Sequence, residues 1–358
     1  MKPWPVALRP LAEETLHSWM SRVAALYRMS LQDLVDYRRS ELHHVMLDFD
    51  TNTLELLASL TRTTPDFVFR YTVGSWKNDC RLQWLTIRQT EPSWMFPHHE
   101  FRFQLTTNYR ESCLLEDAAT TRIEFFRLQW LLAPQTICPR HLTFLRETCR
   151  CCNRQVQAQH WRSKTRFALG CAWTRRPLAQ EPYEYRDIPE TARRGLASFE
   201  QSLLAVIHGR NAPGVWYSKQ SSEDVLQVVC DLIWLLTRHT GSNIYVHHCL
   251  GGSYFRLHYR WPREPQAKPW LGDLRIRDRR SLLATLALLL DSEEKRSIFQ
   301  NPQRAPFSTR TLFQILNADD QQELRHRITL WPAAFQPVAS DLLAGLSSTG
   351  FLKSQSTH

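Results

Sequence analysis

The most distinctive segment of the chain is "ICPRHLTFLRETCRCCNRQV", residues 137–156. It places five potential metal ligands within fifteen positions, namely Cys138, His141, Cys149, Cys151 and Cys152. Two residues separate Cys138 from His141 and Cys149 from Cys152, a spacing that lets one turn present two ligands to a tetrahedral zinc ion. The segment therefore predicts a zinc-ribbon-like structure.

Cys113 and Cys171 flank this stretch and extend the pattern to two sites of three ligands each. A fourth ligand is expected three residues before Cys113 and three residues after Cys171, but Arg110 and Thr174 occupy these positions. We therefore keep open that one or both sites have lost the metal, in which case apolar packing would hold the ribbon. The side chains available for it are those of Phe125, Phe126, Leu128, Trp130 and Phe144.

Three protein ligands with an open position are also how catalytic zinc is bound. The sequence contains no HExxH motif, no Glu placed beside the ligands as a general base, and neither of the glycine-rich phosphate-binding motifs. We therefore expect a protein that is not an enzyme, and a zinc hydrolase is the less favoured alternative.

Composition limits the class of protein. The chain has 358 residues, of which 43% are hydrophobic, which is enough for two or three domains. The formal net charge of +10 favours an anionic partner such as nucleic acid. The start "MKPWPVALRP" lacks the apolar run of an export signal, and no apolar stretch approaches the ~20 residues of a membrane span. We expect a cytoplasmic protein without a membrane partner.

The first hundred residues are predicted to be mostly α-helical. Residues 13–27 repeat apolar side chains at helical spacing, and a second helix begins at Ser30, which suggests a helix-turn-helix-like unit. Two helices of an ordinary bundle explain the pattern equally well. Trp19 reads as a core anchor, and Arg22 as either a solvated residue or an ion-pair partner. Further helices are expected over 52–61 and from Pro65, with Thr64 as the N-cap.

The second half of the chain is predicted as a second helical module. Residues 189–208 and 221–239 read as amphipathic helices, and residues 279–345 as several shorter ones. Between them, "YFRLHYRW" at 254–261 follows a Gly-Gly turn and predicts a β-hairpin. The expected fold is thus mainly α, with modules over 1–108, 109–178 (zinc-ribbon-like) and 189–345, and a flexible tail over 346–358.

Three stretches together resemble TniQ-family proteins. The opening "PWPVALRPLAEETLHSWMSRVAALYRMSLQDLV" is similar to the start of that family, and "YRESCLLEDAATTRIEFFRLQWLLAPQTICPRHLTFLRETCRCC" to its cysteine block. The later "LWPAAFQPVASDLL" is more loosely similar to a helix in the family's C-terminal half. The resemblance is specific over about 1–175 and looser over 190–345.

The resemblance implies a non-catalytic adaptor that selects transposition targets. Such an adaptor would link a target marker to an AAA+ ATPase regulator of TnsC type, which recruits the transposase. The short length favours a CRISPR-associated member that is carried by an RNA-guided effector complex such as Cascade with its crRNA. The alternative is a TnsD-like protein that reads a DNA site itself.

The resemblance also implies a set of site residues. Cys113, Cys138 and His141 match three ligands of the first zinc site, and Cys149, Cys152 and Cys171 match three of the second, where Cys151 could replace Cys152. One or two zinc ions are thus expected. The DNA-reading alternative relies on the basic residues of two segments, and the oligomeric state, monomer or homodimer, stays open. Those basic residues are Arg38, Arg39, Arg275, Arg277, Arg279 and Arg280.

Overall fold

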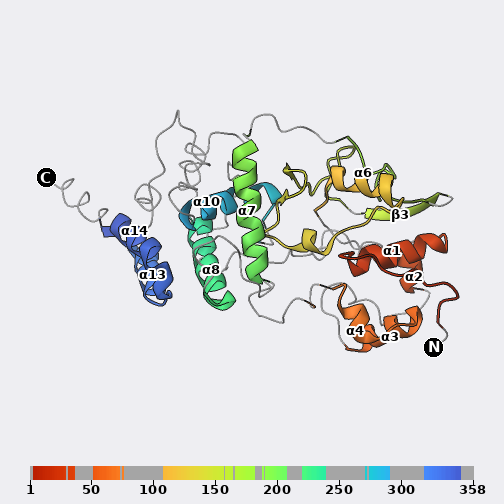
Figure 1. Ribbon diagram of the computed structural model, residues 1–358, viewed down its shortest axis with the longest axis horizontal. Helices are drawn as coiled ribbons and strands as arrows, with labels where there is room; N and C mark the ends of the chain where they lie inside the picture. Colours follow the sequence, from red (N-terminus) through yellow and green to blue (C-terminus); the bar gives the residue numbers. More distant parts are fainter. Residues whose placement is uncertain are drawn as a thin grey trace. The chain divides into compact units, whose positions relative to one another are not determined.

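The chain forms two compact units in a computed structural model (Figure 1). The first unit comprises residues 1–135 and 144–184, and the second comprises residues 136–143 and 185–358. The structure describes residues 3–29, 31–36, 51–72, 75, 108–156, 158–163, 166–181, 188, 190–207, 220–238, 271, 274–290 and 318–347.

Four helices open the first unit: α1 (Leu16–Leu26), α2 (Leu31–Asp36), α3 (Thr51–Thr61) and α4 (Pro65–Phe69). Thr15 and Thr64 cap α1 and α4, because each side-chain oxygen accepts a hydrogen bond from a backbone N–H three residues on. The apolar faces of these helices meet around Trp19, which is fully buried. The predicted helices over 52–61 and from Pro65, and the role of Trp19 as a core anchor, are confirmed.

A buried ion pair fixes the start of α1. Glu14 and Arg22 are both excluded from solvent, and the Arg22 Nε donates to Glu14 Oε1 at 2.7 Å while Nη2 donates to Oε2. Glu14 also accepts from the Ser18 hydroxyl and from the Leu11 backbone N–H, both at 2.9 Å. The ion-pair interpretation of Arg22 is therefore confirmed over the solvated one.

The cysteine-rich part of the first unit is built on α6 (Glu111–Thr120), the 3-10 turn η3 (Leu128–Leu131) and the antiparallel strands β3 (Ala158–Ser163) and β4 (Arg166–Cys171). Strand β3 packs against α1, and β4 packs against α6. The buried carboxylate of Glu124 holds β4 by accepting from the Leu169 N–H at 2.8 Å and from Arg166 at 2.6 Å. The apolar side chains that the sequence assigns to this segment are buried, namely Phe125, Phe126, Leu128, Trp130 and Phe144.

The second unit is mainly helical. Figure 1 shows α7 (Glu190–Ile207), α8 (Ser222–Arg238) and α10 (Ile276–Leu290) together, and each contacts the other two. Helix α8 also contacts α13 (Ala318–Thr329), which contacts α14 (Gln336–Ser347) after the 3-10 turn η7 (Ala333–Phe335). The short strands β1 (Ile137–Cys138) and β2 (Thr143–Phe144) form a two-stranded sheet. Leu196, Phe199 and Leu203 lie on the buried face of α7, as its periodicity predicts.

The mainly α fold is confirmed for the part of the chain that the structure describes. The predicted β-hairpin at 254–261, residues 348–358 of the predicted tail and residues Arg38 and Arg39 lie outside the described residues, and α14 extends to Ser347, two residues into the predicted tail. The helix-turn-helix-like and zinc-ribbon-like modules, with their boundaries, stay predictions. None of the described helices combines the length and apolar character needed to cross a membrane.

Candidate metal centres

Three turns of the chain share one backbone geometry. In each, a cysteine carbonyl accepts from the N–H four residues later: Cys138 from Leu142 at 2.8 Å, Cys149 from Asn153 at 2.8 Å, and Cys171 from Arg175 at 2.7 Å. The fifth residue of each turn is left-handed, with φ between 50° and 54°. A turn of this shape brings the side chains of its first and fourth residues to the same side. The same local structure therefore recurs at three of the positions where the sequence predicts a pair of ligands, whereas Arg110 and Cys113 lie at the start of α6 instead.

The fourth position distinguishes the three turns. It is His141 after Cys138 and Cys152 after Cys149, but Thr174 after Cys171. The third turn thus has the backbone of a two-ligand turn and the side chain of only one ligand. This agrees with the sequence pattern, in which Thr174 stands where a ligand is expected.

Cys149, Cys152 and Cys171 lie together in the first unit. Their sulfur atoms are all within 4.8 Å of one another, and the Cys152 and Cys171 sulfurs are 3.8 Å apart. Tetrahedral coordination with Zn–S bonds of about 2.3 Å separates two thiolates by roughly 3.8 Å. The three thiols therefore have the spacing of zinc ligands. Cys152, not the exposed Cys151, completes this group.

The thiol of Cys171 has an environment that favours its ionised form. Burial by itself raises the pKa of Cys171, but hydrogen bonds from the Thr174 backbone and hydroxyl and from the Trp173 backbone bring the pKa below its usual value. For Cys152, burial raises the pKa above its usual value. Since zinc binds thiolates, Cys171 is the thiol of this group that is better prepared for a cation.

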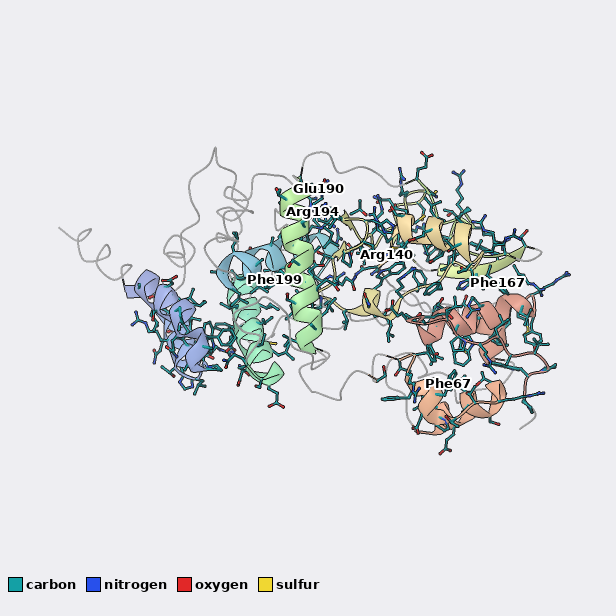
Figure 2. The ribbon with its side chains drawn as sticks, in the orientation of Figure 1. Phe67, Arg140, Phe167, Glu190, Arg194 and Phe199 are labelled. Atoms are coloured by element: carbon teal, nitrogen blue, oxygen red, sulfur yellow. The ribbon has the colours of Figure 1, made fainter. Side chains whose placement is uncertain are left out.

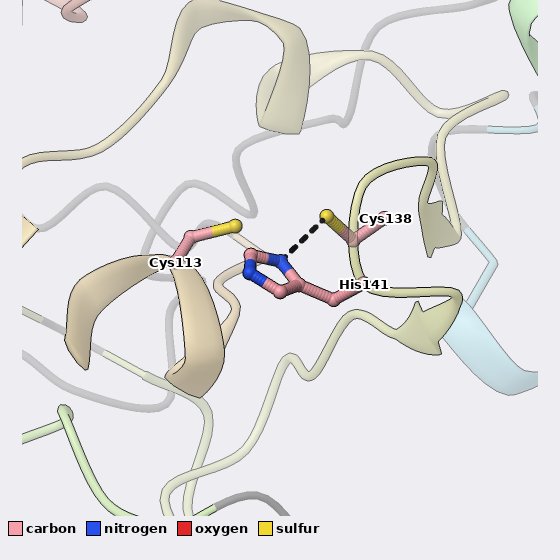
Figure 3. A group of neighbouring side chains, drawn as sticks. All are labelled: Cys113, Cys138 and His141. Carbon is pink, nitrogen blue, oxygen red and sulfur yellow. Dashed lines mark hydrogen bonds between the residues drawn. The ribbon is translucent and has the colours of Figure 1, made fainter. Parts of the chain in front are cut away.

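Cys138 and His141 form the corresponding pair in the second unit. The Cys138 sulfur lies 3.3 Å from His141 Nδ1 (Figure 3), close to the roughly 3.5 Å expected for two ligands of one zinc ion. Cys113, also labelled in Figure 3, is buried in α6 of the first unit. That Cys113 completes this pair stays a prediction. Arg110, at the position of the missing ligand, is buried at the start of α6 and donates to the Phe144 carbonyl at 2.6 Å.

Helix α7 holds the Cys138–His141 hairpin by two side chains. The buried Glu200 carboxylate accepts from the N–H groups of Thr136 and Ile137, at 2.9 and 3.0 Å, and from the Thr136 hydroxyl. Two turns earlier, Arg193 donates to the carbonyl of Leu142, the left-handed residue of the turn, at 3.0 Å. Sequence reasoning missed both contacts, because an acidic and a basic residue on an amphipathic helix are ordinarily assigned to solvent. Figure 2 shows such an exposed pair, Glu190 and Arg194, at the start of the same helix.

The Glu200 carboxyl is expected to make stability depend on pH. Burial raises its pKa from 4.5 to about 8, against the hydrogen bonds from Thr136 and Ile137. Between these values the folded state binds a proton that the unfolded chain has released. The contribution of this group to stability is therefore complete below pH 4.5 and is lost as the pH rises through 8, by at most about 1.4 kcal/mol per pH unit.

Glu200→Gln is neutral at every pH, so we expect its free energy of unfolding to change less than that of the unsubstituted protein between pH 5 and pH 8. Native-state hydrogen exchange of the α7 amides at several pH values, corrected for the intrinsic exchange rate, measures this difference within the second unit. Glu190→Gln, on the exposed face of the same helix, is the matched control and should keep the original pH dependence. An unaltered slope in the Glu200 variant would contradict the prediction.

The basic residues assigned to DNA reading differ in exposure. Arg275 and Arg277 are exposed at the start of α10, whereas Arg279 and Arg280 are buried. A buried guanidinium cannot reach a phosphate without a change of conformation, so the structure favours Arg275 and Arg277 within this set. Their role in nucleic-acid binding stays a prediction.

Comparison with protein families relates part of the chain to a known family. A search of curated proteins finds none that matches the chain. Residues 5–145, less than half of the chain, match the model of the TniQ family, and they include α1 to α4, α6 and the Cys138–His141 turn. This match supports the resemblance drawn from the sequence, and a TniQ domain implies a role in the selection of transposition targets. Over residues 5–145 the chain is thus similar to the TniQ family.

Proposed function

We propose that this protein is a non-catalytic target-selection adaptor in transposition. It links an RNA-guided, Cascade-like effector complex to an AAA+ ATPase regulator, which recruits the transposase. The observation that carries the proposal is the TniQ match over residues 5–145. A protein that connects two partners needs rigid surfaces in a fixed relation rather than a reactive centre, and metal-bound turns are one way to obtain them.

Zinc has a structural role in this proposal. Cys149, Cys152 and Cys171 bind one ion in the first unit, and Cys138 with His141, joined by Cys113, bind a second. The spacing of the thiols and the repeated turn support the first site. At the second site, hydrogen bonds with Glu200 and Arg193 of α7 hold the Cys138–His141 turn in place independently of a metal ion.

We expect purified protein to contain zinc that depends on Cys171. Cys171→Ser removes one of three thiolates and should lower the zinc content by one ion per chain, as measured by mass spectrometry of the metal. Cys151→Ser is the matched control, because Cys151 is exposed and outside the ligand group. Equal zinc contents in the two variants would show that the group around Cys171 does not hold the metal.

The adaptor function is tested by retention of the purified protein on its partners. Immobilised crRNA-loaded effector, immobilised ATPase and target duplex alone are compared, at low and at high salt. We expect retention on effector and ATPase at both salt concentrations, and weak, salt-sensitive retention on the duplex. If the protein is not retained on the effector, or is not retained on the ATPase, the adaptor proposal is refuted.

A TnsD-like site reader is the second candidate function. The formal net charge of +10 and the exposed Arg275 and Arg277 favour contact with DNA. Tight, sequence-dependent binding of the duplex without the effector would support this candidate, because phosphate contacts alone give affinity without sequence preference.

A further inference from the structure

The strongest feature outside the residues discussed so far is a basic surface formed by two of the cysteine turns. The turn after Cys149 carries Arg150 and Arg154, and the turn after Cys171 carries Trp173, Arg175 and Arg176. We call these five residues the knuckle surface. All four arginines are exposed, and Trp173 is 39% exposed, which is unusual for the largest apolar side chain.

One exposed arginine occupies the same position in both turns, Arg154 in the first and Arg176 in the second, five residues after the cysteine. In each turn the cysteine N–H donates to the carbonyl of the residue five positions later, Cys149 to Arg154 at 2.8 Å and Cys171 to Arg176 at 3.0 Å. The cysteines of both turns contribute to one thiol group within 4.8 Å. The fold therefore holds the backbones of the two turns close together at their cysteines, and each turn carries two exposed arginines.

Contacts between the turns make the surface continuous. The Arg154 guanidinium lies 4.9 Å from the centre of the Trp173 ring, a cation–π contact that joins the first turn to the second. Arg150 is oriented by a hydrogen bond from its Nη1 to the backbone carbonyl of Glu181. An aromatic ring thus lies at the surface with the guanidinium group of Arg154 beside it.

The charge of this surface is not neutralised within the part of the chain that the structure describes. None of its four arginines forms an ion pair with a described residue. Residues 146–181 contain eight Lys or Arg and two Glu, a net charge of +6 (8 minus 2), against +10 for the whole chain. More than half of the net charge of the protein is concentrated in about a tenth of its length.

We propose that the knuckle surface binds single-stranded nucleic acid. The arginines contact successive phosphates, and Trp173 stacks on an unpaired base. Closely spaced positive groups with an exposed aromatic ring match this ligand, because phosphates repeat along the strand and every base has a face on which a ring can stack. A protein partner with acidic residues would use the charge but would give the ring no specific role.

This inference does not depend on the adaptor proposal. The adaptor function is tested by binding to two proteins, whereas the knuckle surface is tested by binding to bare oligonucleotides. Either result can fail while the other holds. The residues concerned are also different from Arg275 and Arg277, which belong to the second unit.

The test uses the full-length zinc-loaded protein and labelled oligonucleotides of about 20 nucleotides, a length sufficient for one such site. Fluorescence anisotropy gives the dissociation constants for single-stranded RNA, single-stranded DNA and duplex DNA over a range of salt. The first variant changes Arg150, Arg154, Arg175 and Arg176 to Gln. The matched control changes Arg9, Arg28, Arg62 and Arg70 to Gln, which removes the same charge from exposed arginines of the same unit.

We expect the knuckle variant to bind single strands on the order of a hundredfold more weakly, with the slope of log K against log salt reduced by about 3, since each lost phosphate contact removes about 0.7. The control should lose less than about threefold. Trp173→Ala should weaken single-strand binding by about tenfold and leave duplex binding nearly unchanged, and Trp173→Phe should restore most of it. Comparison of the dissociation constants for single-stranded RNA and single-stranded DNA identifies which of the two is the preferred ligand.

Three outcomes would overturn the proposal. Equal losses in the knuckle variant and the control would mean that only the total charge matters. Unchanged binding in the knuckle variant would show that nucleic acid binds at another surface. Absence of oligonucleotide binding by the unsubstituted protein would show that it has no such site. Circular dichroism and zinc content, compared for all variants, separate loss of binding from loss of folding.

Discussion

Arg22→Met is expected to destabilise α1 by about 3–5 kcal/mol, the usual cost of leaving one member of a buried ion pair without its partner. The substitution leaves the Glu14 carboxylate fully buried with hydrogen bonds from Ser18 and Leu11 but without a compensating charge. It also removes the hydrogen bond from Arg22 to the Arg9 carbonyl, which holds the N-terminal segment onto the helix.

Native-state hydrogen exchange of the α1 amides measures this effect locally. A global unfolding curve of a protein with two units would not separate the stability of α1 from that of the other unit. Protection should fall at least a hundredfold in Arg22→Met, since 1.4 kcal/mol corresponds to a factor of ten. Arg62→Met, at an exposed position in the same unit, is the control. In the double variant with Glu14→Leu the loss should be smaller than the sum of the single losses. Unchanged protection in Arg22→Met would show that Glu14 takes up a proton or finds another partner.

Thr174→Cys is expected to strengthen zinc binding at the first-unit site by about a hundredfold. The turn after Cys171 already has the backbone of a two-ligand turn, and its fourth side chain already contacts the Cys171 thiol. The substitution therefore supplies a fourth thiolate without a change of backbone. The binding free energy of zinc at a four-ligand site is about 10–16 kcal/mol, so each ligand contributes roughly 3 kcal/mol, which corresponds to about a hundredfold in affinity.

Competition with a chromogenic chelator measures the zinc affinity of the variant. In the cobalt-substituted protein, the sulfur-to-metal charge-transfer band should become stronger by roughly a third as three thiolates become four. Thr174→Ser has nearly the same shape but no thiolate, so it should resemble the unsubstituted protein in both measurements. If Thr174→Cys binds zinc no more tightly than Thr174→Ser, the fourth coordination position is already filled by another group.

The elements that the sequence predicted well are those whose signal is local. Apolar spacing placed helices over α1, α3 and α7, and Thr64 before Pro65 marked the start of α4. The cysteine pairs likewise placed the turns at Cys138 and Cys149, because the spacing of two ligands and the shape of the turn are one property of a few residues. The structure also places a turn of the same backbone geometry at Cys171, where Thr174 stands at the position of the expected ligand.

Buried charged residues could not be predicted in this way. Glu124 and Glu200 are both excluded from solvent, and their partners lie far away along the chain: Glu124 binds the Leu169 N–H, 45 residues on, and Glu200 binds the Thr136 N–H, 64 residues back. A glutamate in an amphipathic helix or a loop is assigned to solvent by default, since burial of a charge is costly without partners. Whether partners exist depends on the tertiary structure.

The positions of the helices and of the cysteine turns follow from the sequence, since both depend on interactions among residues a few positions apart. Which thiols meet depends on the tertiary structure. It brought Cys171 within 3.8 Å of Cys152, nineteen residues away, and excluded the neighbouring Cys151. It also required glycine at position 170, where a Cβ would lie 2.7 Å from the Arg176 carbonyl oxygen and 1.7 Å from the Trp161 ring. The physical reason is that a three-dimensional contact depends on the path of the whole chain between its two residues, whereas spacing records only their separation along it.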